Sequence, residues 1–342
     1  MTATYASEWP VPAPALDWTG WTTTCDAGTI SNEFRNRVIS RINAFRRLAG
    51  SPADVALDLG YSDQAQQAAL IMAANFQLSH NPPPTWRCWT QVGHDAAGSS
   101  NLANYGGLDV VDLYVHDTGT NNTAAGHRWW LLRSPGRRMG VGSTYGANAM
   151  YVVDGSYQPR PVREPDGFLA WPPRGFVAYQ LATIRWSFMI DGGNYSSATV
   201  TMTSNGQQLP VTVEDRGSYS QLVWRPSNMD PNGFNWWWPQ PSGDQVIDVT
   251  ISGVLVNGVS RTFSYSTIVY DPDDPASRYR GTSAPGRSSP SRWAVSAGCR
   301  PAPRPSAGPP GRGPDASSTR GQAGGRPDRP GRAGSPRPAR SR

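Results

Sequence analysis

The spacing of apolar residues changes once along this chain, and the change divides it into two kinds of structure. Up to about residue 154, apolar side chains recur every three to four residues, as on one face of a helix. The clearest set, which Gly50 ends, comprises Phe34, Val38, Ile42, Phe45 and Leu48. Between residues 184 and 270, short segments alternate apolar and polar residues, as half-buried strands do. We therefore expect an α+β first part and an all-β second part.

The first part is expected to hold helices followed by strands. A second helix begins after Ser62 and must stop before the prolines at 82–84, so His80 lies just past its C-terminal end. Further helices are predicted over 109–116 and 124–133. Residues 139–142 and 149–154 are then predicted to form two strands.

The second part has the strand pattern of an immunoglobulin-like sandwich. Turn residues such as Asn205-Gly and Asn257-Gly separate its short segments. The predicted strands cover 184–190, 198–203, 208–213, 221–224, 245–252 and 261–270. Six or seven short strands in about 100 residues fit this architecture. The Cys-Trp-Cys signature of true immunoglobulin domains is absent, so the pattern predicts the architecture alone.

Composition sets the predicted boundaries. An N-terminal extension covers 1–21, the first domain 22–156, a Pro- and Arg-rich linker 157–174, and a β-sandwich domain 175–272. The last predicted segment is a tail over 273–342, rich in Arg, Pro and Gly, which we expect to be disordered.

The formal charge of +6 belongs to that tail. From Arg278 onward, fourteen arginines and two aspartates give +12, which leaves −6 for residues 1–277. An acidic body disfavours nucleic acid as a partner. No apolar run approaches the roughly eighteen residues of a membrane-spanning helix, so the sequence argues against an integral membrane protein. The first residues also lack the basic and apolar regions of a secretory signal, so a signal either lies upstream or is not used.

All four histidines fall in the first part of the chain: His80, His94, His116 and His127. Imidazole is the commonest metal ligand among side chains and titrates near neutral pH. Because His80 follows one predicted helix and His127 begins another, folding can bring the two together across a groove. The alternative is that such histidines only cap helix ends or are solvated.

Several short motifs, in this order, carry a family resemblance. They are Leu78-Ser79-His80, Ser100-Asn101-Leu102-Ala103, Gly126-His127-Arg128 and Met139-Gly140-Val141-Gly142. Over about residues 30–154 the chain resembles the bacterial branch of the CAP superfamily, which groups cysteine-rich secretory, antigen 5 and pathogenesis-related proteins. The resemblance implies a three-layer α-β-α sandwich. It also implies a cleft in which two histidines and two glutamates lie, and in which some members bind zinc or another divalent ion.

His80 and His127 match the two histidine positions of that cleft, whereas the glutamates do not carry over. The family sequence Gly-Glu-Asn-Leu-Ala is here Ser-Ser-Asn-Leu-Ala, over 99–103, and no glutamate occurs between Glu33 and Glu164. An acid in the cleft must therefore be an aspartate. The expected cleft residues beside the two histidines are Ser100, Asn101, Asp112, Asp117, His94 and His116, with Asp95 a further acid.

A metal hydrolase needs about three protein ligands and an open position for water. Two histidines and a serine fall short unless another histidine or an aspartate completes the set. We therefore expect a secreted or cell-surface module whose cleft binds a divalent cation such as zinc, an apolar ligand or a partner, without clear catalysis. Lipid, sterol, cell-wall glycan and protein are the partners that remain open.

Two alternatives also remain open. One is a metal-dependent hydrolase of peptide or cell-wall material. The other is attachment to glycan or a surface through the β-sandwich, where Trp236, Trp237 and Trp238 form a candidate aromatic platform.

Three cysteines allow one disulfide with a thiol left over. Cys25 and Cys88 lie in the same predicted domain, whereas Cys299 lies in the tail. A Cys25–Cys88 bond would argue for an oxidising compartment.

Overall fold

The structure is a computed structural model that describes residues 2–230, 237–274 and 277. The predicted disordered tail beyond residue 277, with Cys299, and residue Trp236 lie outside the described residues. The described part of the chain is mixed α+β, as the sequence predicts. Among the described residues, the search for a helix both long and apolar enough to span a bilayer finds none.

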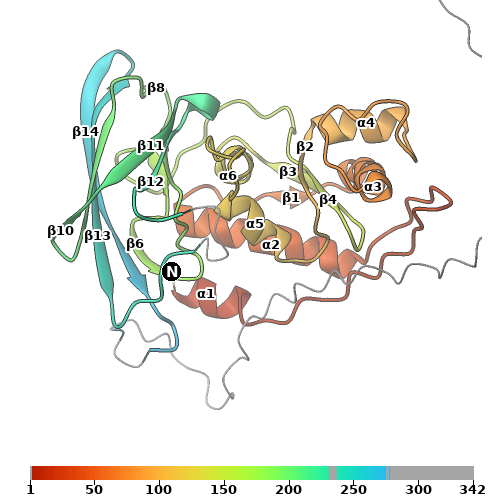
Figure 1. Ribbon diagram of the computed structural model, residues 1–342, viewed down its shortest axis with the longest axis horizontal. Helices are drawn as coiled ribbons and strands as arrows, with labels where there is room; N and C mark the ends of the chain where they lie inside the picture. The colour runs from red at the N-terminus through yellow and green to blue at the C-terminus, as the bar shows by residue number, and fades with distance from the viewer. Residues whose placement is uncertain (1, 231–236, 275–276, 278–342) are drawn as a thin grey trace, which may run out of the picture. The chain divides into compact units, whose positions relative to one another are not determined.

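The first part is built on a four-stranded sheet in the order β1-β3-β4-β2. Its strands are β1 (Ala56–Leu57), β2 (Ser100–Ala103), β3 (Arg138–Ser143) and β4 (Asn148–Tyr151). β1 runs parallel to β3, and the other pairs are antiparallel. Figure 1 shows helices on both sides of this sheet. On one side lie α3 (Leu59–Asn75) and α4 (Gln91–Gly98), and on the other α2 (Asn32–Ala49), α5 (Val110–His116) and α6 (Gly126–Leu132).

The helix ends follow from local sequence. Ser31 caps α2 by accepting from the Phe34 amide, and Gly50 ends it in the left-handed conformation. Asp58 caps α3 in the same way through the Tyr61 amide. A short helix α1 (Thr2–Glu8) precedes them, and the following Trp9 packs edge-on against Phe45 of α2 with ring centroids 5.0 Å apart.

The second part consists of two sheets. The larger has the order β10-β9-β13-β14-β6, with β8 paired to β13. Its strands are β6 (Gly175–Ala178), β8 (Gly193–Asn194), β9 (Thr199–Ser204), β10 (Gln207–Leu209), β13 (Gln245–Val256) and β14 (Val259–Tyr270). The smaller has the order β11-β12-β7-β5. Its strands are β5 (Phe168–Trp171), β7 (Trp186–Ile190), β11 (Val211–Arg216) and β12 (Leu222–Pro226), and a 3-10 turn, η1 (Ser218–Ser220), joins β11 to β12.

The two sheets pack through aromatic side chains. Phe188 of the smaller sheet contacts Phe263 of the larger at 5.1 Å between ring centroids, and Phe168 contacts Tyr265 at 5.7 Å. β5 lies inside the segment that the sequence predicts as a linker, and it pairs with β7 throughout its length. The predicted domain boundaries are not otherwise tested and remain predictions.

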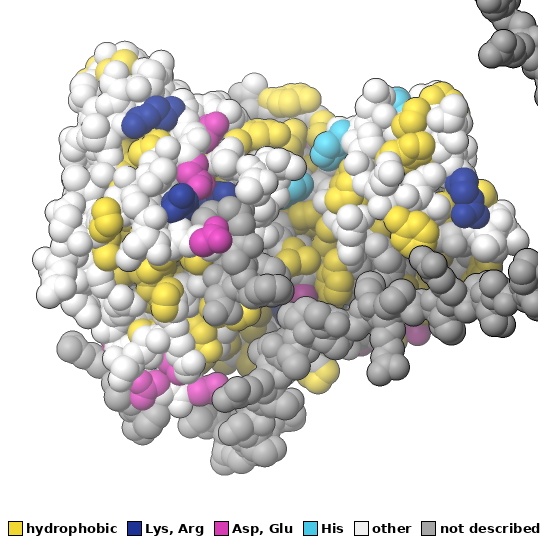
Figure 2. Space-filling view, viewed as in Figure 1, with side chains coloured by type: hydrophobic (Ala, Val, Ile, Leu, Met, Phe, Trp, Pro, Cys, Tyr) yellow, Lys and Arg dark blue, Asp and Glu magenta, His cyan; other side chains and the backbone are white. Residues whose placement is uncertain are grey.

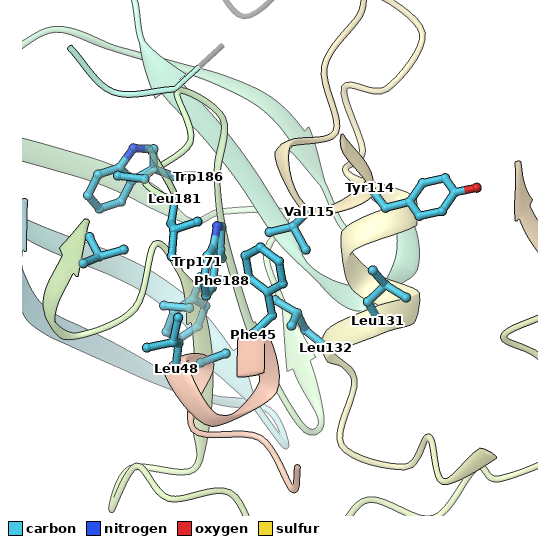
Figure 3. Close-up of a cluster of buried hydrophobic side chains, with 14 of the residues drawn as sticks. Phe45, Leu48, Tyr114, Val115, Leu131, Leu132, Trp171, Leu181, Trp186 and Phe188 are labelled. Atoms are coloured by element: carbon cyan, nitrogen blue, oxygen red, sulfur yellow. The ribbon is translucent and has the colours of Figure 1, made fainter. Parts of the chain in front are cut away.

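One buried core runs through both parts. Figure 3 shows Phe45 of α2 and Leu132 of α6 beside Trp171 and Phe188 of the smaller sheet. The rings of Phe45 and Trp171 meet edge to face at 5.3 Å between centroids. Burial of these apolar surfaces is the main force that holds the two parts against each other.

Candidate functional site

His80 is positioned by the end of α4. It follows α3, which ends at Phe76 in the left-handed conformation, and its Nδ1 lies 2.9 Å from the carbonyl oxygen of Ala97 in the last turn of α4. The side chain is exposed. A proton on Nδ1, donated to that carbonyl, leaves the lone pair on Nε2 directed away from the contact.

His127 is positioned by a buried carboxylate. Its Nδ1 lies 2.7 Å from Oδ1 of Asp117, whose side chain is fully buried, and the other oxygen of Asp117 accepts the Arg128 amide at 3.1 Å. Asp117 ends α5 in the left-handed conformation, which turns it toward the start of α6. The ring of Tyr114 stacks on the imidazole at 5.4 Å. Burial opposes a charge on His127, but the hydrogen bond and charge of Asp117 outweigh it, and the pKa of His127 is raised.

Both histidines are tied to one five-residue segment, 97–101, which leads from α4 into β2. Ala97 holds the ring of His80, and the Asn101 side chain donates to the carbonyl oxygen of His127 at 3.0 Å. Between them, Ser100 is buried, and its Oγ has no hydrogen-bond partner among the described residues. These contacts link His80 and His127, through segment 97–101 and Asp117, to residues that the sequence analysis names as candidates; their shared role in a cleft stays a prediction. Figure 2 shows histidine side chains (cyan) beside a hollow on this face.

The other two histidines are fully engaged elsewhere. His94 has Nδ1 at 2.9 Å from Asp95 and Nε2 at 2.7 Å from Asn81. His116 is buried, with its two ring nitrogens against the carbonyl oxygens of Asp112 and Gln180, and burial lowers its pKa. Neither has a ring nitrogen left for a ligand.

Asp112 also serves a structural purpose. Its carboxylate accepts from Trp9 Nε1 at 2.7 Å and pairs with Arg41 at 2.8 Å. It thereby joins the N-terminal segment to α2 and α5. Within the described ranges, no three His, Cys, Asp or Glu side chains are grouped so that they could hold a metal ion.

Cys25 and Cys88 form a disulfide. The predicted tryptophan platform differs from the expectation at Trp238, which is buried against Trp186 and donates from Nε1 to Gln245 at 2.7 Å. Trp238 is therefore part of the core and cannot stack on a ligand. Trp237 is only partly buried, and Trp236 lies outside the described residues.

The second part contributes residues to the site that sequence reasoning misses. Arg185, which directly precedes β7, donates to the carbonyl oxygens of Asp117 and Gly119 and pairs with Glu214 at 2.5 Å. Gln221 donates to Ala124 at 2.6 Å. Together they hold the loop between α5 and α6, which carries Asp117. The one feature of the sequence that indicates such a role is the charged residue Arg185 within the predicted, mostly apolar strand 184–190.

Two further residues complete this junction. Arg128 is fully buried and donates to the Val115 carbonyl at 2.6 Å and to Ser187 Oγ of β7 at 3.0 Å. Tyr219 of the β11–β12 turn contacts Trp129 at 5.6 Å between centroids. A Cβ at Gly126 would lie 2.7 Å from the Tyr219 ring, so a larger residue there would displace that ring beside His127.

Comparison with known proteins agrees with the first part of this description. No curated protein matches the chain. Among solved structures, the crystal structure of PcoC, a methionine-rich copper resistance protein from Escherichia coli, aligns at 15% identity over 29% of this chain and 92% of that chain, with a TM-score of 0.22. Residues 39–155 match the family model of the cysteine-rich secretory protein family, CAP. The chain therefore contains a CAP domain over these residues.

Proposed function

We propose that this protein binds a divalent cation such as zinc through His80 and His127, without turnover. One observation carries the proposal. Of the four histidines, these two each direct Nδ1 at an oxygen acceptor, while Nε2 has no hydrogen-bond partner among the described residues. Metal-binding histidines usually donate their second ring nitrogen to a carboxylate or carbonyl in this way. Asp117 and Ala97 would serve as those outer partners.

The donor set fits an exchangeable ion. Structural zinc sites use four protein ligands and catalytic sites about three, whereas the proposed site has two imidazoles. The Ser100 hydroxyl, which is buried and has no hydrogen-bond partner among the described residues, is a candidate third donor. Water or a bound ligand would complete the coordination. A bound ion would act as a Lewis acid toward an oxygen-bearing ligand.

The test is a calorimetric titration of the full chain with Zn²⁺ at neutral pH. We expect one equivalent to bind, the double variant His80→Ala/His127→Ala to lose it, and His94→Ala to retain it, because both nitrogens of His94 are already bonded. Binding that survives in the double variant would place the ion elsewhere and refute the proposal. Absence of binding in the wild type would favour an apolar ligand or a protein partner in the cleft.

A second candidate is hydrolysis of peptide or cell-wall material. The Asp117–His127 pair favours it, because a buried carboxylate that orients an imidazole is the usual support of a general base. Turnover of cell-wall fragments that persists unchanged in the His80→Ala/His127→Ala variant would exclude this candidate.

We further propose that the protein is secreted or surface-located and that its parts are a three-layer α-β-α sandwich and an immunoglobulin-like sandwich. The Cys25–Cys88 disulfide supports an oxidising location. Helices on both sides of the first sheet and aromatic packing between the other two support the architectures.

A further inference from the structure

A small cavity lies away from the histidine cleft, where α1, the end of α2 and the segment around residue 163 meet. Its volume is about 240 Å³. The residues that line it are Thr4, Arg47, Gly50, Ser51 and Arg163. Two of these five are arginines and none is acidic. The wall therefore carries positive charge and hydroxyl groups.

Backbone hydrogen bonds assemble this wall from distant parts of the sequence. The Gly50 carbonyl accepts from the Arg163 amide at 2.8 Å, which fixes the two segments side by side. The amides of Gly50 and Ser51 both donate to the Arg46 carbonyl and so cap the end of α2. Because that carbonyl is already satisfied, the negative end of the helix is partly masked at the cavity.

Two carboxylates that lie beside lining residues pair more closely with other arginines. Glu8 pairs with Arg37 and accepts from Ser40 at 2.8 Å, so its contact with Arg47, at 3.7 Å, is the loosest that it makes. Glu164, the neighbour of Arg163, pairs with Arg174 at 3.0 Å.

Other charged groups in this region are distributed as follows. Asp54 pairs with Arg160 at 2.7 Å, so it too is occupied. The Arg163 guanidinium has no ion pair within the part of the chain that the structure describes.

Ser51 supplies an independent indication of a ligand. The residue is 6% exposed, and its Oγ has no hydrogen-bond partner among the described residues. A buried hydroxyl without a partner is costly, and native proteins rarely leave one unexplained. A hydroxyl always has one proton to donate, so an acceptor entering the cavity would satisfy it.

We propose that this cavity binds a tetrahedral oxyanion, a phosphate or phosphate ester, through the guanidinium groups of Arg47 and Arg163 and the hydroxyl of Ser51. The planar guanidinium group of arginine presents pairs of N–H donors that match two oxygens of such an anion. Hydrogen bonds to a charged acceptor are also stronger than those between neutral groups. The same chemistry serves free phosphate and a phosphoryl group on a larger molecule. The site does not depend on the proposed cation site.

The test uses the full chain in a buffer that contains only chloride as anion. Inorganic phosphate, glycerol 3-phosphate as a monoester and glycerophosphoglycerol as a diester are titrated separately by calorimetry. We expect saturable binding that weakens with ionic strength. Preference for the diester would identify a phosphodiester polymer as the source of the group, and equal or better binding of phosphate would identify a free ligand.

Variants separate a built site from general attraction to arginine. Arg163→Ala should weaken phosphate binding roughly tenfold or more, and Ser51→Ala roughly threefold to tenfold. Arg261→Ala, at an exposed arginine of β14, is the matched control and should bind like the wild type. The His80→Ala/His127→Ala variant should also bind phosphate unchanged, whether or not the cation site exists.

Thermal unfolding provides a second readout for Ser51. Without phosphate, Ser51→Ala should melt no lower than the wild type, because it removes an unsatisfied buried hydroxyl. With phosphate, the wild type should gain more in melting temperature than the variant, since a ligand stabilises the state that binds it. The proposal is overturned if no anion binds saturably, or if Arg163→Ala and Ser51→Ala bind phosphate as tightly as Arg261→Ala.

Discussion

The protonation of His127 is decided by one neighbouring residue. The ring is mostly buried, which alone would lower its pKa, yet the carboxylate of Asp117 at 2.7 Å raises it. A raised pKa means that protonation stabilises the fold. This contribution is complete below the ordinary histidine pKa of about 6.5 and is lost as the pH rises through the higher pKa of the folded state. His116 acts with the opposite sign, because burial lowers its pKa and its contribution is lost as the pH falls.

We therefore predict that Asp117→Asn lowers the pKa of His127 below the wild-type value, since burial then acts unopposed. Residue-resolved NMR titration of the imidazole Cε1–H signals is the appropriate measurement, because bulk stability would mix the opposing effects of His116 and His127. Asp95→Asn, which changes the exposed partner of His94, should leave the His127 titration unmoved. An unchanged His127 pKa in Asp117→Asn would show that the carboxylate does not set it.

At this scale the sequence singles out the two histidines as candidates but does not separate Asp117, which contacts His127, from Asp112. The two aspartates are five residues apart, Asp112 in the first turn of one short helix and Asp117 at its C-terminal end. Asp117 takes the left-handed conformation that ends α5 and so turns toward α6, whereas Asp112 is in the first turn of α5 and contacts Trp9 and Arg41. The direction of each side chain depends on where the helix stops, which is known only to within a few residues from sequence.

At the scale of elements, α3 packs on β3 through glycines. A Cβ at Gly142 would lie 2.2 Å from the Ala65 carbonyl carbon, and one at Gly140 would lie 2.3 Å from that of Tyr61. Both obstacles are helix backbone and cannot rotate away. The Met-Gly-Val-Gly motif is thus a requirement for contact between helix and sheet. Hydrogen bonds from Val141 to Ser62 and from Ser143 to Gln66 complete that contact.

Gly142→Ala is predicted to destabilise the protein by about 3 kcal/mol or more, because α3 must move away from the sheet. The measurement is urea unfolding followed by circular dichroism. Gly146→Ala is the matched control, since a Cβ there meets nothing within 4 Å, and it should change stability by less than about 1 kcal/mol. Equal stability of the two variants would mean that the helix is not held this closely.

Helices and strands with a regular spacing of apolar residues could be predicted from the sequence, whereas β5 could not. Its segment, Phe168–Trp171, is surrounded by prolines and arginines, and that composition predicts a linker. The strand forms because all four residues pair with β7 and are buried. Pairing with a distant segment outweighs local composition here, and local patterns do not contain that information.

At the scale of the whole described unit, the surroundings of His127 and of the proposed cation site depend on both parts of the chain. Arg185 and Gln221 of the second part hold the carbonyl oxygens of residues 117, 119, 124 and 125, between α5 and α6. The aromatic core is also continuous through Phe45 and Trp171. None of these contacts could be predicted from the sequence, because they join residues that lie in different predicted segments: the first domain, the linker and the β-sandwich.

We predict that the two parts unfold as one cooperative unit and that Arg185→Met weakens both. Removing one partner of a buried ion pair costs about 3 kcal/mol, and Glu214 keeps Arg225 as a second partner at 2.9 Å. Amide hydrogen exchange at increasing urea concentrations should show α2 and β13 opening with the same free energy, lowered equally in the variant. Two separate opening energies in the wild type would contradict this prediction.

Arg225→Met is the matched control, because it removes the other partner of Glu214 within the second part alone. It should lower global stability while the amides of residues 117–125 keep their local protection. In Arg185→Met that loop should lose protection before global unfolding, since its two carbonyl acceptors lose their donor. If the site depends on the loop, Zn²⁺ affinity should then fall in Arg185→Met and be retained in Arg225→Met, at a temperature where both variants are folded.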